Sequence, residues 1–200
     1  MRRRLALAVP LLLVAPMLLA SCGLSERPYA ERRQWPLMPR RPRSEAPRVR
    51  GPVLLVRTLR TGPGLDSRGL QSLQPDGSIR TAFYEEWAAP PAQAAEEALR
   101  GWLAESGVFA AVIAQGSRVE ADQVLEGELT ALWTVPTIGQ AHCAMGITVL
   151  DHRGANVRVR LQQRFAAEAA LAGPSPREAV EAQAAALALV FSRIEAALRI

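Results

Sequence analysis

The most distinctive chemical group in this sequence is the thiol of Cys22, which stands at the end of an apolar stretch near the start of the chain. Three of the first four residues are arginine, and residues 5–20 are apolar throughout. A charged start, a short apolar stretch and small residues before a cleavage point are typical of a secretory signal peptide. The stretch is shorter than the ~20 residues of a spanning helix, and Pro10 and Pro16 interrupt it. We therefore expect residues 1–21 to be a signal peptide.

The four residues Leu19-Ala20-Ser21-Cys22 resemble the bacterial lipobox. In a lipobox the cysteine thiol receives a diacylglycerol, the signal peptide is removed, and the acylated cysteine becomes the mature N-terminus. Each buried acyl CH₂ contributes ~0.8 kcal/mol, so several chains on Cys22 would anchor the protein to a membrane. Gly23 stands where lipoproteins retained in the inner membrane often carry Asp, so the resemblance implies the periplasmic face of the outer membrane. The alternative is a secretory signal with an incidental Cys near its cut.

Few other residues are candidates for catalysis or metal binding. Neither His142 nor His152 has a His, Cys or carboxylate partner at the spacing of a zinc site. Cys143 adjoins His142, but neighbours on a strand point to opposite faces and cannot form a Cys–His pair. The acidic pairs Glu85-Glu86 and Glu96-Glu97 are interpreted as solvated surface.

The sequence therefore predicts no enzyme, no metal and no cofactor. It has no nucleophile elbow, P-loop or dinucleotide fingerprint. Cys143 lies in an alternating apolar run, and we expect it to be a buried, inert thiol.

The basic charge of the chain is confined to its first quarter. The net charge is +5, but residues 1–50 hold eleven Arg against three Glu, a net charge of +8. Residues 51–200 hold thirteen Arg against sixteen acidic residues, a net charge of −3. A nucleic-acid surface needs clustered basic charge on the folded domain itself. The distribution therefore argues against nucleic acid as a partner.

A Pro- and Arg-rich segment follows the cysteine, and we expect residues 22–52 to be the lipidated N-terminus and a flexible tether. Pro-rich segments favour extended conformations of ~3.1 Å per residue, so the tether would reach ~90 Å at most and hold the domain clear of the membrane. Its arginines have two interpretations. Either they lie on anionic head groups, each worth ~1 kcal/mol near a charged surface, or they are merely solvated.

Residues 53–200 carry the periodicities of one domain. An apolar run at residues 53–56 predicts a buried strand. Two further runs, at residues 70–73 and 79–84, flank the turn signal Pro75-Asp76-Gly77-Ser78 and predict a hairpin.

Two helices are predicted. After Pro90-Pro91, apolar residues recur at helical spacing through Glu105, namely Ala95, Leu99, Trp102 and Leu103, and Gly107 is a natural left-handed stop. Near the end of the chain, Ser175 and Glu178 form a capping box ahead of a long apolar stripe.

Between the helices, three segments alternate apolar and polar residues, which is the pattern of an antiparallel sheet with one covered face. The residues expected on the covered face are Leu125, Leu129 and Trp133; Cys143, Met145, Ile147 and Val149; and Val157, Val159, Leu161 and Phe165. The expected fold class is α+β, a mostly antiparallel or mixed sheet with two main helices packed on one face.

Five pieces of the sequence stand in a distinctive order behind the lipobox. They are Val53-Leu54-Leu55-Val56, Gly64-Leu65-Asp66-Ser67-Arg68, Tyr84-Glu85-Glu86-Trp87-Ala88-Ala89-Pro90-Pro91, Leu125-Glu126-Gly127-Glu128-Leu129 and the Ala-rich closing helix from Ala179. This order resembles the ABC-type transport auxiliary lipoproteins, the PqiC-type outer-membrane lipoproteins. One departure is at the start, where the family's opening Tyr-x-Leu strand is missing or is replaced by Trp35-Pro36-Leu37.

The resemblance implies a non-catalytic lipoprotein subunit of an ABC-type phospholipid transport system. Such systems combine the transporter with a periplasmic protein of the mammalian-cell-entry (MCE) class. The subunit would dock or brace that protein at the outer membrane and support membrane integrity. Phe83, Tyr84 and Trp87 are the candidate contacts, because exposed aromatic residues anchor interfaces. The alternative for these three is local packing at a strand–helix junction.

Two other functions stay open at this point. One is an outer-membrane lipoprotein that activates a peptidoglycan synthase or assists envelope assembly, which shares the plan of anchor, tether and domain. The other is a periplasmic hydrolase, which would need a nucleophile–base pair that the sequence does not show. The sequence also leaves open whether the chain forms a homo-oligomer.

Overall fold

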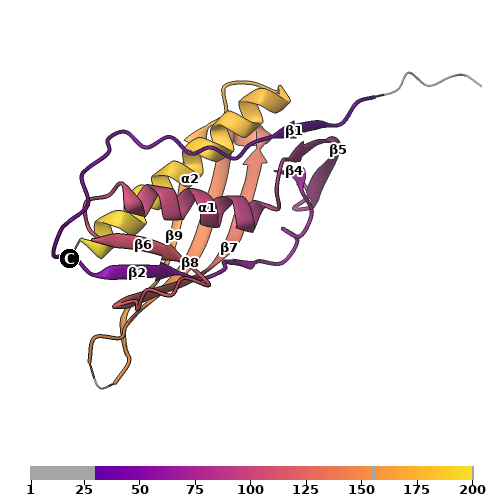
Figure 1. Ribbon diagram of the computed structural model, residues 1–200. Helices are drawn as coiled ribbons and strands as arrows, with labels where there is room; N and C mark the ends of the chain where they lie inside the picture. Colours follow the sequence, from indigo (N-terminus) through magenta and orange to yellow (C-terminus); the bar gives the residue numbers. More distant parts are fainter. Residues whose placement is uncertain (1–29, 155, 200) are drawn as a thin grey trace, which may run out of the picture. The chain divides into compact units, whose positions relative to one another are not determined.

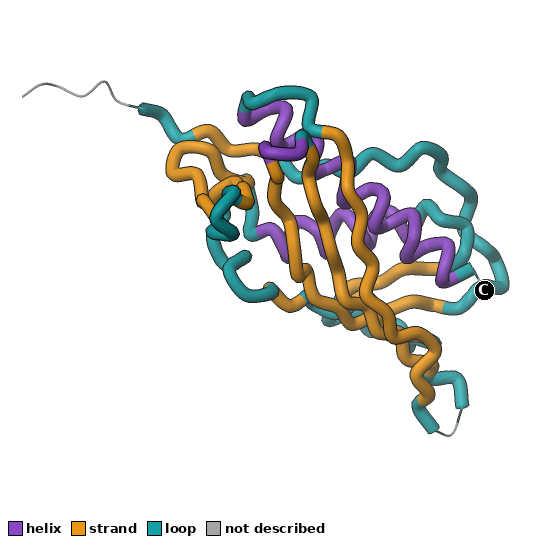
Figure 2. Tube along the Cα trace, turned by 180° about the vertical axis from the view of Figure 1, so that it is seen from behind, coloured by secondary structure: helices purple, strands orange, loops and turns teal. Residues whose placement is uncertain are grey.

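A computed structural model describes residues 30–154 and 156–199, and its compact unit begins at Glu31. The expected signal peptide and Cys22 lie outside the described residues. In the described part, two helices lie on one face of a nine-stranded mixed sheet (Figure 1). Seen from behind, the sheet presents its other face, which no helix of the described part covers (Figure 2). The expected α+β architecture is confirmed.

Three long antiparallel strands form the centre and one edge of the sheet. They are β7 (Gln123–Val135), β8 (Gln140–Asp151) and β9 (Arg158–Ala170). A short 3₁₀ helix, Pro136–Ile138, connects β7 to β8. Within the described chain β9 pairs only with β8, so it is an edge strand.

Six shorter strands lie on the other side of β7. They are β1 (Arg33–Trp35), β2 (Val53–Val56), β3 (Arg60–Thr61), β4 (Gly69–Leu73), β5 (Ile79–Trp87) and β6 (Ala111–Ala114). β2, β3 and β4 pair with β7 in parallel, one after another along its length. β6 pairs with β2, β5 is antiparallel to β4, and β1 is parallel to β5. The predicted hairpin is β4 and β5.

The first helix ends and the second helix begins at the expected signals. α1 (Pro91–Ala104) starts on a proline, whose missing N–H would have no helical partner at that position. It ends shortly before Gly107, which has a left-handed φ of 68°. α2 (Pro176–Leu198) carries the predicted capping box. Ser175 Oγ accepts the backbone N–H of Glu178 at 3.3 Å, and Glu178 Oε2 accepts that of Ser175 at 2.9 Å.

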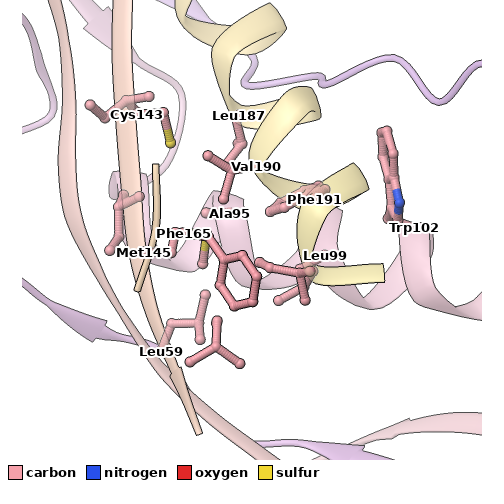
Figure 3. Close-up of a cluster of buried hydrophobic side chains, with 14 of the residues drawn as sticks. Leu59, Ala95, Leu99, Trp102, Cys143, Met145, Phe165, Leu187, Val190 and Phe191 are labelled. Atoms are coloured by element: carbon pink, nitrogen blue, oxygen red, sulfur yellow. The ribbon is translucent and has the colours of Figure 1, made fainter. Parts of the chain in front are cut away.

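The hydrophobic core lies between the helices and the sheet (Figure 3). Its labelled members include Ala95 and Leu99 from α1, Leu187, Val190 and Phe191 from α2, and Cys143, Met145 and Phe165 from the sheet. Fully burying one Leu or Phe side chain stabilises a fold by ~1.5–3 kcal/mol. This layer therefore fixes how the helices lie on the sheet.

The alternation of faces in β7 is interrupted once. The pairing with β8 shifts between Leu129 and Ala131, and beyond that shift Leu132, not Trp133, is fully buried. A bulge sets two residues opposite one, so the side chains beyond it change faces. The expectation that Trp133 shares the covered face with Leu125 is therefore wrong.

The hairpin between β8 and β9 also differs from expectation. Val157 and Val159 are exposed, although Phe165 farther along β9 is buried as predicted. The hairpin projects beyond the end of the helices, so nothing in the described chain covers its tip (Figures 1 and 2).

The structure corrects the expected boundary between tether and domain. Residues 31–52 belong to the compact unit, not to a flexible tether. Residues 36–50, which we call the strap, cross the helix side of the domain between β1 and β2 (Figure 1). Leu37 is buried, and the backbone N–H of Arg48 donates to the carbonyl of Phe109 at 3.0 Å. An extended Pro-rich segment has no internal hydrogen bonds, so its contacts with the domain hold it in place.

Candidate functional surfaces

The sequence candidates for chemistry are not brought together. Cys143 is fully buried, and burial raises the pKa of its thiol far above the ordinary value, so the thiol is inert as expected. His142 lies beside Trp133, with ring centroids 5.6 Å apart, and His152 follows β8 in the hairpin turn. Across residues 30–154 and 156–199, no cluster of three or more His, Cys, Asp or Glu side chains could hold a metal.

The three candidate aromatic contacts divide into an exposed pair and a core residue. Phe83 and Tyr84 of β5 are 66% and 47% exposed, and their rings meet nearly edge to face at 5.0 Å. The guanidinium of Arg32 lies 4.4 Å from the centroid of the Phe83 ring. Trp87 is 1% exposed. It lies where β5 is flanked by both β1 and β4, just before α1 begins, so it packs into the core and the expectation of a Trp87 contact is wrong.

The acidic pair Glu85-Glu86 fastens β1 to β5, which corrects its interpretation as solvated surface. Glu85 accepts the indole N–H of Trp35 at 2.8 Å and pairs with Arg33. Glu86 is buried, accepts a side-chain N–H of Gln34 in β1 at 3.0 Å and pairs with Arg68 at 2.9 Å. Both carboxylates therefore hold the strand that leads into the strap.

β5 leaves part of its outer edge open. β1 pairs with that edge only at Glu85–Trp87. In the described chain, residues 79–84 have β4 on one side and no strand on the other. An open strand edge next to exposed aromatic side chains is suited to binding a partner in extended conformation.

A buried charged cluster around Glu195 holds the strap on the helices. Glu195 of α2 pairs with Arg41 of the strap, accepts the indole N–H of Trp102 at 2.7 Å and pairs with Arg199 at 2.7 Å. Burial alone raises the pKa of Glu195, but the hydrogen bonds from Arg41, Arg199 and Trp102 outweigh it and lower the pKa to about 2. The carboxylate is therefore charged under all ordinary conditions. Sequence reasoning missed this cluster, because Arg41 and Glu195 are 154 residues apart.

Two hollows flank the strap on the helix side. One, of about 820 Å³, lies between the strap and α2, and the other, of about 710 Å³, lies between the strap and α1. Met38 and Arg40 of the strap line both hollows, as does Trp102 of α1. Met38 is 69% exposed, and Leu189 across the larger hollow is 45% exposed.

The opposite face of the sheet carries a polar hollow of about 610 Å³. Its lining includes two ion pairs that link neighbouring strands, Arg57 with Glu126 and Arg60 with Glu128, the latter at 3.1 Å. The two faces of the domain thus differ in polarity.

The family follows from a match that spans most of the domain. The model of the ABC-type transport auxiliary lipoprotein component matches residues 36–195, from the strap to α2. The chain belongs to this family. The resemblance inferred from the sequence is thereby confirmed, and the auxiliary lipoprotein is a component associated with ABC-type transport. No helix of its described part is long and apolar enough to cross a membrane.

Solved structures share the fold of this auxiliary lipoprotein. A Xanthomonas campestris protein is 19% identical, with a TM-score of 0.63 over 74% of this chain and 83% of its own. An uncharacterized protein is 17% identical, with a TM-score of 0.63 over 83% of this chain and 96% of its own. The hypothetical protein CT253 of Chlamydia trachomatis is 12% identical, with a TM-score of 0.52 over 74% of this chain and 98% of its own. At these identities the likeness shows the fold alone. No curated protein matches the chain.

Proposed function

We propose that this auxiliary lipoprotein is a non-catalytic, lipid-anchored subunit of an MCE-associated phospholipid transport system. Acylated Cys22 anchors it to the periplasmic face of the outer membrane, where it docks or braces the periplasmic MCE protein and supports membrane integrity. The family match over residues 36–195 carries this proposal. The lipobox-like ending of the signal sequence supports the anchor.

The contact with the MCE protein is assigned to the open edge of β5. Phe83 and Tyr84 provide exposed aromatic area there, and Arg32 stacks on one of the rings. Aromatic and arginine side chains are enriched among the residues that dominate binding energy, each costing about 2 kcal/mol or more on truncation. Unpaired backbone groups along the same edge can bond an extended segment of the partner.

The test is co-purification of the lipidated protein with the MCE protein from mildly solubilised membranes. The variant is Phe83→Ala combined with Tyr84→Ala, and the matched control is Val157→Ala combined with Val159→Ala in the exposed hairpin. Both pairs are exposed, so both variants should keep the thermal stability of the wild type. We expect the first variant to lose most of the MCE protein and the control to retain it.

Two results would contradict the proposal at different levels. If the Phe83/Tyr84 variant retained the MCE protein in full, the contact at β5 would be wrong and the docking function would stand. If the wild type brought down a peptidoglycan synthase and no transport component, the docking function itself would be wrong.

A further inference from the structure

The strap makes the helix side of the domain basic. Residues 36–50 contain five Arg and one Glu, a net charge of +4, whereas residues 51–200 carry −3. Because the strap is held on the domain by Leu37 and Arg41, this charge is fixed across the helices. Arg40 and Arg43 are exposed, and no carboxylate of the described residues lies within 4.0 Å of either guanidinium.

An apolar surface lies beside these arginines. α2 has no charged residue between Glu181, which pairs with Arg177, and Arg193. A helix that is apolar on all sides is normally buried, yet Leu189 points outward and is exposed. Met38 of the strap is exposed on the other wall of the same hollow. Met38 and Leu189 therefore offer two exposed apolar side chains on opposite walls of one hollow.

The length of chain between Cys22 and the domain limits how far the domain can lie from the membrane. Ala30, the first described residue, is only eight residues further along the chain than Cys22. An extended chain spans at most ~3.6 Å per residue, so eight residues reach about 30 Å. A tether through residue 52 would have held the domain far from the bilayer, but a linker of this length keeps it within contact range.

We propose that the helix-and-strap face, formed by Met38, Arg40, Arg43, Ala185 and Leu189, lies on the surface of a bilayer that contains anionic phospholipid. Its apolar side chains enter the boundary between head groups and acyl chains, and its arginines bind the phosphates. A lipid anchor combined with a basic patch gives more stable attachment than either alone. The proposal rests on the Cys22 anchor and leaves the β5 edge free for a protein partner.

The experiment uses the full lipidated protein reconstituted into phosphatidylcholine vesicles with or without phosphatidylglycerol. A cysteine introduced by Met38→Cys or Leu189→Cys carries an environment-sensitive NBD label, and a control label is placed by Gln162→Cys in the polar hollow of the opposite face. Cys143 is buried and Cys22 is acylated in the proposal, so neither competes for the label. Nitroxide-labelled lipid reports contact between the label and the bilayer.

We expect the labels at positions 38 and 189 to shift to the blue and to be quenched several-fold more than the label at 162. Arg40→Gln combined with Arg43→Gln should weaken quenching at 189 in vesicles with phosphatidylglycerol. Arg60→Gln combined with Arg164→Gln, an equal charge change on the other face, should leave it unchanged.

Three results would overturn the proposal. The first is equal quenching at positions 38, 189 and 162. The second is a blue shift at 189 that lipid quencher does not affect and that arises only on adding the MCE protein, which would assign the face to a protein. The third is loss of the wild-type protein from the vesicles, which would refute the anchor itself.

Discussion

Glu195 is the single residue on which the position of the strap depends most. It joins Arg41 of the strap, Trp102 of α1 and Arg199 after α2 in one cluster. The side chains of Glu195 and Arg41 are only 10% and 11% exposed. Removing one partner of a buried ion pair leaves an uncompensated charge and typically costs 3–5 kcal/mol. The cluster therefore ties the basic strap to the helices.

We expect Glu195→Gln to lower the free energy of unfolding by about 3 kcal/mol and to make the strap sensitive to protease. The matched control is Glu181→Gln on the same helix, whose exposed pair with Arg177 should change stability by less than about 0.5 kcal/mol. Urea unfolding and limited proteolysis measure both effects. Equal stability of the two variants would show that the cluster does not hold the strap.

The pKa of Glu195 gives this prediction a pH dependence. Its folded-state pKa of about 2 lies below its ordinary value of 4.5, so its ionised form stabilises the fold above pH 4.5. That contribution is lost as the pH falls from 4.5 towards about 2, because the carboxylate takes up a proton. The stability difference between wild type and Glu195→Gln should therefore shrink on acidification from pH 7 to pH 3. A constant difference would contradict the assigned pKa.

At the residue scale, features made by neighbouring residues in the sequence could be predicted, and contacts between residues far apart in the sequence could not. The capping box at Ser175 and the helix stop near Gly107 are properties of a few consecutive residues, so the local sequence was sufficient to predict them. The partners of Glu195 come from three segments of the chain, and no periodicity connects them. Trp87 was ambiguous because an aromatic residue at a strand–helix junction suits both a core and an interface.

At the scale of elements, close packing of β7 against β8 and against Leu59, just before β3, depends on a glycine. A Cβ added to Gly127 of β7 would lie 2.8 Å from Ile147 Cδ1 and 2.9 Å from both the Gly146 carbonyl oxygen and Leu59 Cδ2. A Cβ added to Gly146 of β8 would meet nothing within 4 Å. The two glycines are close in the same pair of strands, which makes them a matched comparison.

We expect Gly127→Ala to destabilise the protein by about 1–3 kcal/mol, because the core must shift to admit the methyl group. Gly146→Ala should be neutral or slightly stabilising, because it reduces the freedom of the unfolded chain. Thermal unfolding of both variants is the measurement. A Gly127→Ala variant as stable as Gly146→Ala would show that the packing of this part of the sheet is loose.

Long elements were predictable because each repeats its own period many times. α1, α2 and the three long strands follow this rule. The buried faces of β7 and β9 were only partly predictable. In β7 a bulge after Leu129 reverses the alternation of buried and exposed side chains. In β9 the hairpin at Val157 extends beyond the helices, which leaves its apolar side chains exposed. β1, β3 and β6 are too short to show a period, and they form only because neighbouring strands offer pairing edges.

At the scale of the whole molecule, the domain presents surfaces of different chemistry in different directions. The helix-and-strap face is basic and apolar, the opposite sheet face is polar, and the edge of β5 carries the exposed pair Phe83 and Tyr84. A short linker from Cys22 and a fixed strap would allow the protein to hold a bilayer and a protein partner at the same time. The sequence predicted the family, but its Pro- and Arg-rich segment gave no sign of packing on the domain.

Photo-crosslinking in cells tests whether this auxiliary lipoprotein docks an MCE protein at the membrane. A photoreactive amino acid replaces Tyr84 on the β5 edge, and the control replaces Thr148 in the polar hollow. Mass spectrometry then identifies the captured proteins. We expect an MCE-class protein to be captured from position 84 and not from position 148. Capture of a peptidoglycan synthase alone, or of no envelope protein from position 84, would contradict it.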